Sequence, residues 1–93
     1  MNPASAARRV VLEGEYDLTR KAEIATLFQA LDGDGELIID LTNVTYLDST
    51  VLDQLAALRR RSARRSITLA GANDHIRHIF TIVGFDRIFT TAE

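Results

Sequence analysis

The sequence predicts a single α/β domain built on a mixed, mainly parallel sheet of four to five strands, with helices packed against it. Short β-branched runs alternate along the chain with stretches whose apolar residues have the i, i+3, i+4, i+7 spacing of a helix. Residues 37–41 are almost all apolar, which is typical of a strand covered on both faces. The chain has 93 residues, enough for one hydrophobic core but not for two.

The first strand and the first helix are predicted from residues 10 to 31. Residues 10–12 form a β-branched run, and residues 15–18 are expected to add a small extra strand. Thr19 is the expected N-cap of the helix, because its hydroxyl can accept a hydrogen bond from a free amide of the first turn. The helix is expected to bury one apolar face, formed by Ile24, Leu27, Phe28 and Leu31.

The middle of the chain predicts a turn, a buried strand and a second helix. The Asp-Gly-Asp-Gly segment over 32–35 ends the first helix in a surface turn. The buried strand over 37–41 follows, and residues 42–47 are expected to connect it to the second helix. That helix begins at residues 48–50 and ends near residue 61 or 65. Its buried face is expected to contain Val51, Leu55 and Leu58.

The last third of the chain predicts a strand, a third helix and a final strand. The first of these strands covers residues 67–70 and the last covers residues 88–90. Asn73 or Asp74 can cap the start of the helix, and Gly84 stands where a left-handed C-terminal cap is needed. The expected buried face of this helix contains Ile76, Ile79, Phe80 and Val83.

Composition excludes several classes of protein. The absence of cysteine excludes disulfide frameworks, thiolate nucleophiles and zinc ribbons, and a net charge of −2 argues against a dedicated nucleic-acid binder. No nucleophile–base pair or cofactor motif is visible, so we expect no enzyme and no cofactor. Residues 1–7 lack the apolar core of a signal peptide. We therefore expect a flexible tail over 1–7, a domain over 8–93 and a cytoplasmic protein without membrane insertion.

Asp48, Ser49 and Thr50 are the most informative polar residues, because they stand where a buried strand passes into a helix. Functional sites of parallel sheets gather at such places, and the loops with Asp17 and Asn73 are equivalent positions. Two interpretations of the triplet stay open. It can simply cap the helix, which is worth about 1 kcal/mol. Alternatively, Ser49 is phosphorylated, which adds a charge of about −1.5 to −2 and reverses partner binding without unfolding the domain.

Two further clusters have simpler interpretations. His75 and His78 have a spacing that can hold a metal, but no third ligand is evident, so we expect a solvated helix face and no metal site. Five arginines lie within residues 59–65, where we expect them to end the second helix. Cations there interact favourably with the helix C-terminus, by about 0.3–1 kcal/mol each. An acidic protein partner is the second interpretation of this cluster and nucleic acid the third.

Three segments resemble the STAS domain, whose best-known members are bacterial anti-sigma factor antagonists. They are residues 13–18, Glu-Gly-Glu-Tyr-Asp-Leu; residues 37–52, which contain Asp48-Ser49-Thr50; and residues 79–89, which contain Val-Gly-Phe-Asp-Arg. The segments occur in the family's order, and the resemblance extends from about Arg9 to Glu93.

This resemblance implies a mechanism of partner switching. In such antagonists the unphosphorylated protein binds an anti-sigma factor and frees the sigma factor. The anti-sigma factor is often a kinase that phosphorylates the serine after the aspartate, and a phosphatase resets the protein. The resemblance makes Ser49 the phosphoacceptor of this chain and implies a monomer or weak dimer. The expected partner-binding residues are Asp17, Asp48, Ser49, Thr50, Val51 and Asn73.

One position departs from the family motif, which has glycine where this chain has Val51. A β-branched valine adds bulk at the start of the helix. It would either hinder a docking kinase or enlarge an apolar contact with a particular partner. Val51 therefore favours a second function, that of an unphosphorylated STAS subunit in a larger assembly, such as a lipid-transport ABC system or a signalling scaffold.

Overall fold

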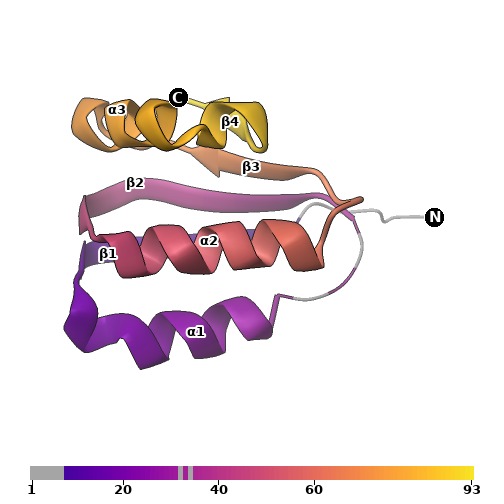
Figure 1. Ribbon diagram of the computed structural model, residues 1–93, viewed down its shortest axis with the longest axis horizontal. Coiled ribbons are helices and arrows are strands. Elements are labelled where there is room, and N and C mark those ends of the chain that lie inside the picture. Colours follow the sequence, from indigo (N-terminus) through magenta and orange to yellow (C-terminus); the bar gives the residue numbers. More distant parts are fainter. Residues whose placement is uncertain (1–7, 32, 34) are drawn as a thin grey trace.

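The computed structural model describes residues 8–31, 33 and 35–93, which form one four-stranded sheet and three α-helices. Every neighbouring pair of strands is parallel, in the order β1-β2-β3-β4 (Figure 1), which confirms the predicted class. The predicted tail over 1–7 and two residues of the predicted turn, 32 and 34, lie outside the described residues. The elements are β1 (Arg8–Tyr16), the 3₁₀ turn η1 (Leu18–Arg20), α1 (Lys21–Gln29), β2 (Leu37–Leu47), α2 (Ser49–Arg61), β3 (Ile67–Ala70), α3 (Asp74–Val83), the 3₁₀ turn η2 (Phe85–Arg87) and β4 (Thr90–Ala92).

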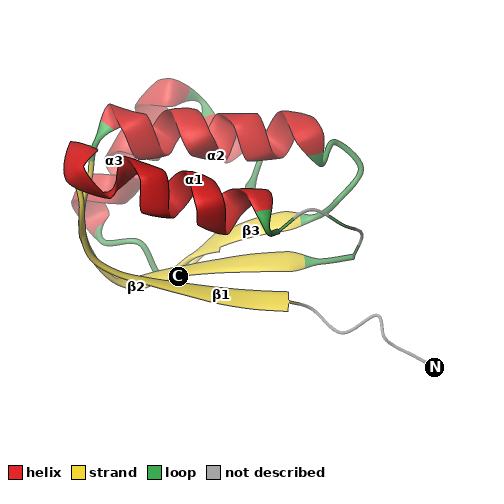
Figure 2. Ribbon diagram, turned by 90° about the horizontal axis from the view of Figure 1, so that it is seen from below, coloured by secondary structure: helices red, strands yellow, loops and turns green. Residues whose placement is uncertain are grey.

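All three helices cover the same face of the sheet (Figure 2). Each helix connects one strand to the next strand of the sheet, and right-handed crossovers in a constant direction carry every helix to the same side. The burial pattern of β2 shows that only one face of the sheet is covered. Leu37, Ile39 and Leu41 are completely buried, whereas Ile38 and Asp40 on the other face are only half-buried. The prediction that this segment is covered on both faces is therefore wrong.

β2 is longer than predicted, because it includes residues 42–47, which we expected to be a connection. The pairing of β1 with β2 sets nine residues of β1 against eleven of β2. Two register shifts, between Val11 and Glu13 and between Gly14 and Glu15, take up the two extra residues. Such bulges break the alternation of buried and exposed side chains, and this is why residues 42–47 do not look like a strand in the sequence.

The first strand and helix also differ from the prediction. The two strands predicted at 10–12 and 15–18 are one strand, β1, which ends at Tyr16. Asp17, rather than Thr19, caps the turn that follows, and no side chain caps α1 itself. Asp17 directly follows the strand, and its carboxylate accepts hydrogen bonds from both the amide and the hydroxyl of Thr19. Thr19 is therefore a donor to the cap and not the cap itself.

The end of the chain follows the prediction more closely. Asn73, one of the two predicted candidates, caps α3, and Gly84 adopts the predicted left-handed conformation at its C-terminus with φ of 83°. Val83, however, is 46% exposed and lies outside the core. The last strand covers residues 90–92 instead of 88–90, because η2 takes up the preceding residues.

The core lies between the sheet and the helices. Ile24 and Phe28 of α1 and Leu55 and Leu58 of α2 are completely buried. Burying one such side chain contributes about 1.5–3 kcal/mol, so these residues fix both helices on the sheet. The start of α2, which carries the candidate site, is thereby held in place by packing against the sheet.

Gly71 and Gly84 provide a matched pair for a test of packing after β3. Both have a left-handed backbone, with φ of 77° and 83°. A Cβ atom on Gly84 would meet nothing within 4 Å, whereas one on Gly71 would lie 3.2 Å from the Cα of Thr42. We expect Gly84→Ala to lower the free energy of unfolding by about 1–2 kcal/mol, the cost of the left-handed conformation. Gly71→Ala should cost about 1–3 kcal/mol more, because it also overpacks against β2. Urea denaturation measures both changes, and equal losses would contradict the proposed contact.

Candidate functional site

Two aspartates follow neighbouring strand ends. Tyr16 and Leu47 are the last paired residues of β1 and β2, and Asp17 and Asp48 come directly after them. The Asp48 amide donates a hydrogen bond of 3.1 Å to the Tyr16 carbonyl. The two loops therefore meet at the carboxyl edge of the sheet, at the end of the molecule where all three helices begin (Figure 1).

Asp48 is the N-cap of α2. Its backbone is extended, and its Oδ1 accepts hydrogen bonds from the amides of Thr50 at 2.9 Å and of Val51 at 3.3 Å. The capping interpretation of the triplet is thus correct for Asp48. Its carboxylate accepts hydrogen bonds from two amides of the first helical turn that have no partner within the helix. The carboxylate is therefore already engaged within the protein.

Ser49 is the first residue of α2, and it is exposed. Its hydroxyl makes no hydrogen bond within the described part of the chain. Asp48 provides the cap, so the serine hydroxyl is not needed for it and points to no internal partner. The geometry leaves Ser49 chemically available at the positive end of a helix, an environment that tolerates an added anion.

Asp17 lies in the adjoining loop and caps η1. Its Oδ1 accepts hydrogen bonds from both the amide and the hydroxyl of Thr19, with the amide at 2.9 Å. These bonds, the one from the hydroxyl most of all, hold the pKa of Asp17 below its ordinary value. Asp17 is exposed and remains a carboxylate at neutral pH, so it contributes negative charge to the same edge as Asp48.

Arg20 fixes this loop, a role that the sequence did not suggest. Its guanidinium donates to the carbonyls of Glu13 and Glu15 at 3.0 and 3.1 Å and pairs with Glu23 at 2.6 Å. It also lies over the Tyr16 ring, 3.9 Å from the centroid. Arg20 therefore joins the bulged end of β1 to α1. The only sequence signal for this was its spacing of three residues from Glu23, which is common on any helix.

Leu18 is an exposed apolar residue at the site, and, like Arg20, the sequence did not indicate it. It follows Asp17 directly, and 66% of its surface is exposed. Tyr46, which precedes Leu47 at the end of β2, is 44% exposed. These two side chains provide apolar surface beside the acidic groups. An alternation pattern could have identified Tyr46 only if the bulges of β2 had been known.

Thr50 and Val51 point less toward solvent than expected. Thr50 is half-buried, and Val51 belongs to the hydrophobic core with 1% of its surface exposed. The valine methyl groups therefore offer no apolar contact to a partner and put no bulk in front of Ser49. The predicted place of Val51 on the buried face of the helix is thus confirmed, whereas the two effects expected of it on a partner both need its side chain at the surface.

Asn73 caps a different helix and is not brought level with the two aspartates by the strands. Its side chain accepts a hydrogen bond of 2.8 Å from the Ile76 amide. β3 ends at Ala70, which is paired with Asp40, whereas β2 continues for seven further residues to Leu47. Asn73 is exposed, and its role in partner binding stays a prediction.

The two histidines lie exposed on α3. The described residues contain no group of three or more potential metal ligands. None of the helices described here has the length and apolar character needed to cross a membrane.

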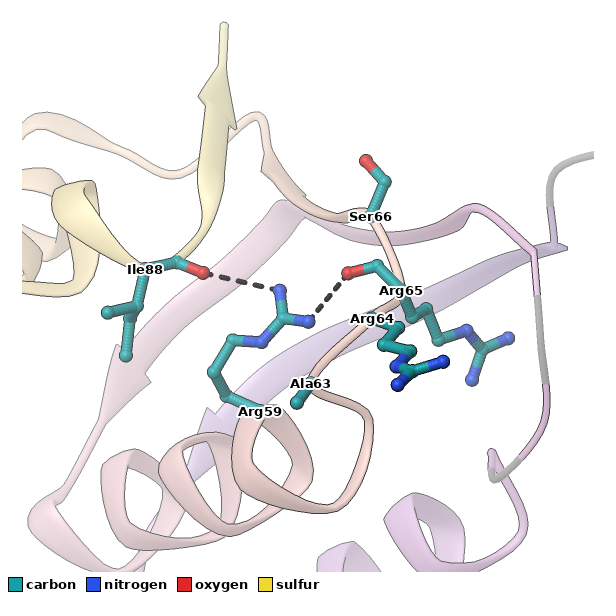
Figure 3. A pocket seen from close by; sticks show the side chains of 6 residues that line it. All are labelled: Arg59, Ala63, Arg64, Arg65, Ser66 and Ile88. Carbon is teal, nitrogen blue, oxygen red and sulfur yellow. Dashed lines mark hydrogen bonds between the residues drawn. The ribbon is translucent and has the colours of Figure 1, made fainter.

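The arginine cluster ends α2, as predicted, and does more than interact with the helix dipole. Arg59 donates to the carbonyls of Arg65 and Ile88 (Figure 3), and also to that of Ser62. Arg61 donates to the Phe28 carbonyl, and Arg65 donates to those of Leu31 and Gly35. These guanidinium groups satisfy carbonyls at the C-terminal ends of both α1 and α2, and thereby join the two helix ends.

Replacing Asp48 tests which residue caps α2. We expect Asp48→Ala to lower the free energy of unfolding by about 1 kcal/mol, because two amides lose their acceptor. Ser49→Ala should change it by less than about 0.5 kcal/mol, because the hydroxyl makes no internal bond. Chemical denaturation of the two variants measures the difference. A loss in Ser49→Ala as large as that in Asp48→Ala would make Ser49 the cap.

Replacing Thr19 tests the cause of the lowered pKa of Asp17. Thr19→Ala removes the hydroxyl bond and keeps the amide bond, so the pKa of Asp17 should rise only part of the way to its ordinary value. Because the folded-state pKa is the lower one, ionised Asp17 favours the folded form above the ordinary pKa, and this contribution is lost as the pH falls. Carboxyl NMR titration measures the pKa, with Thr26→Ala on α1 as the control. An unchanged pKa in Thr19→Ala would refute the assigned cause.

Comparisons with known proteins agree on the family. The family model described as "Mlab, STAS domain" matches residues 2–90. A STAS-domain containing protein of Pseudomonas aeruginosa (strain UCBPP-PA14) is 37% identical over 83 residues, which cover 86% of this chain and 82% of the relative. The chain belongs to the STAS domain family.

Proposed function

We propose that this protein is an anti-sigma factor antagonist, which binds an anti-sigma factor with serine kinase activity and is released when Ser49 is phosphorylated. The observation that carries the proposal is the exposed Ser49 hydroxyl, which has no hydrogen-bond partner among the described residues, beside the engaged carboxylate of Asp48. Because the STAS family consists mainly of regulatory interaction domains, an exposed serine at this place is more useful as a switch than as a catalytic group.

The negative charge of a phosphate on Ser49 would not be neutralised by neighbouring groups and would remain exposed to a bound partner. The first-turn amides of Thr50 and Val51 are already bonded to Asp48, so they are not free to neutralise it. Arg20, in the adjoining loop, is engaged with Glu23 and two carbonyls. The modification would therefore place a charge of about −1.5 to −2 beside Asp48 and Asp17. A partner that packs on this edge would meet that charge, while the helix dipole keeps the fold intact.

The buried side chain of Val51 supports phosphorylation more than the sequence suggested. A kinase has to bring its active site to the Ser49 hydroxyl, and the valine methyl groups are turned into the core. Leu18 and Tyr46 offer the partner apolar contact area beside the acidic groups. A partner of this surface would combine an apolar patch with basic side chains. A kinase that uses ATP, and the phosphatase that would reset Ser49, imply a cytoplasmic location. The free protein in this proposal is a monomer or weak dimer.

The second candidate is a constitutive interaction subunit of a larger complex, such as a lipid-transport ABC system or a signalling scaffold. The observation that favours it is the description of the matching family model, "Mlab, STAS domain", which does not refer to an antagonist. In that case the same edge binds its partner permanently, and Ser49 is never modified.

Incubation with the cognate anti-sigma kinase and ATP separates the two candidates. The antagonist should gain one phosphate, detected by mass spectrometry, and the gain should disappear in Ser49→Ala. Persistence of the phosphate in Ser49→Ala, or no phosphate on the wild-type protein, would count against the switch. Stable association of the unmodified protein with an ATPase and a permease would support the constitutive subunit.

A charge at Ser49 should weaken partner binding directly. We expect Ser49→Asp to reduce affinity for the anti-sigma factor by about tenfold or more, equivalent to about 1.4 kcal/mol, while Ser49→Ala binds like the wild type. Thr90→Asp is a matched control, because it adds the same charge at an exposed position on the edge strand β4. Calorimetric titration measures the affinities. Equal losses in Ser49→Asp and Thr90→Asp would attribute the effect to net charge alone and refute a local switch.

A further inference from the structure

A concave surface lies at the C-terminal end of α2, at the opposite end of that helix from Ser49. It is a shallow depression, open to solvent, with a volume of about 520 Å³, and the described residues that line it include no acidic side chain (Figure 3). The thirteen residues of α2 span about 20 Å, so this hollow is separate from the proposed site at Ser49. The lining residues are Arg59, Ala63, Arg64, Arg65, Ser66 and Ile88.

Arg59 is held in a fixed orientation within this hollow. Its guanidinium donates to the carbonyls of Ile88 at 3.2 Å and of Arg65 at 2.6 Å, as the dashed lines in Figure 3 mark, and also to the carbonyl of Ser62. All three acceptors are neutral, so they orient the group without cancelling its charge. The orientation is established before any ligand binds, which reduces the entropic cost of binding.

Arg64 provides a second cation on the same turn. It is exposed, and it also lines a neighbouring hollow of about 330 Å³. Across the part of the chain that the structure describes, neither Arg59 nor Arg64 forms an ion pair with a carboxylate. The charge on this turn is therefore available to a ligand.

The negative end of the helix dipole does not outweigh these cations. It corresponds to about half an elementary charge, and two arginines contribute two positive charges. Arg59 also covers the Ser62 and Arg65 carbonyls, so these oxygens are engaged and do not repel an anion. The two guanidinium charges therefore exceed the opposing charge of the helix end.

We propose that this hollow binds a phosphate group carried by a soluble small molecule or by a lipid headgroup. The planar guanidinium of Arg64, which makes no hydrogen bond within the described residues, can bind phosphate oxygens in a bidentate manner, and the fixed guanidinium of Arg59 adds its charge. A protein partner would instead need about 800 Å² of surface, far more than this concave site offers.

Arg64→Gln and Arg60→Gln form a matched pair for the test. Both arginines are exposed residues of the same cluster, and both changes remove one positive charge, but Arg60 does not line the hollow. Neither side chain makes a hydrogen bond or ion pair within the described residues, so both variants should fold. Arg59 is left unchanged because it also holds the turn together.

The test is a titration of the ¹⁵N-labelled protein with inorganic pyrophosphate at about 0.15 M salt, followed through the arginine side-chain Nε–H signals. We expect shifts at Arg59 and Arg64, about tenfold weaker binding in Arg64→Gln, and a change below about twofold in Arg60→Gln. Equal weakening in the two variants would reveal diffuse attraction and overturn the proposal, as would tighter binding of a glutamate-rich peptide than of pyrophosphate.

Vesicle sedimentation distinguishes the two sources of phosphate. Phosphatidylcholine vesicles with and without phosphatidate are compared for wild type, Arg64→Gln and Arg60→Gln. Phosphatidate-dependent sedimentation that Arg64→Gln alone abolishes supports a lipid headgroup, and binding of pyrophosphate without sedimentation supports a soluble ligand. Absence of both, in a protein that is folded by circular dichroism, overturns the proposal.

Discussion

The pairing of β1 with β2 is the constraint on which the candidate site depends. The register starts at Arg8 and Leu37 and, after two extra residues in β2, ends with Tyr16 opposite Leu47. Only with both bulges do the two strands end level, so that Asp17 and Asp48 enter adjacent loops. Arg20 fixes the irregular end of β1 through the carbonyls that the bulges leave for a side-chain donor. The position of Ser49 thus follows from an irregularity of the sheet.

Local chemistry was predictable from the sequence, whereas the shape of the sheet was not. The caps at Asp48, Asn73 and Gly84 depend on interactions within four residues; Gly84 was predicted as such, and Asp48 and Asn73 were each among the candidates for their helix start. The length of β2 depends on its partner strand, which compensates the extra residues. The open face of the sheet follows from the order of four strands and the handedness of their connections, and an apolar run such as 37–41 carries no record of either.

The structure settles the capping interpretation of the Asp48-Ser49-Thr50 triplet and leaves Ser49 available for the proposed modification. Capping belongs to Asp48, whose carboxylate binds two amides. The hydroxyl of Ser49 is thereby released from a structural role, which is a requirement for any modification that must not unfold the domain. Val51 completes the division, because its burial anchors the first turn of α2 to the core. A rigid helix start with one free hydroxyl can change its charge without changing its shape.

The two ends of α2 use charge in opposite ways. At its start, acidic groups lie near the positive end of the dipole, and the Asp48 carboxylate accepts hydrogen bonds from amides of the helix itself. At its end, Arg59, Arg61 and Arg65 satisfy carbonyls, so that much of the cluster's hydrogen-bonding capacity serves the joint between α1 and α2. Because carbonyls accept hydrogen bonds without removing charge, this structural use leaves the positive field of Arg59 intact. Arg59 can therefore hold the turn after α2 together and still attract an anion, so a cluster explained by stability has a binding role open to it.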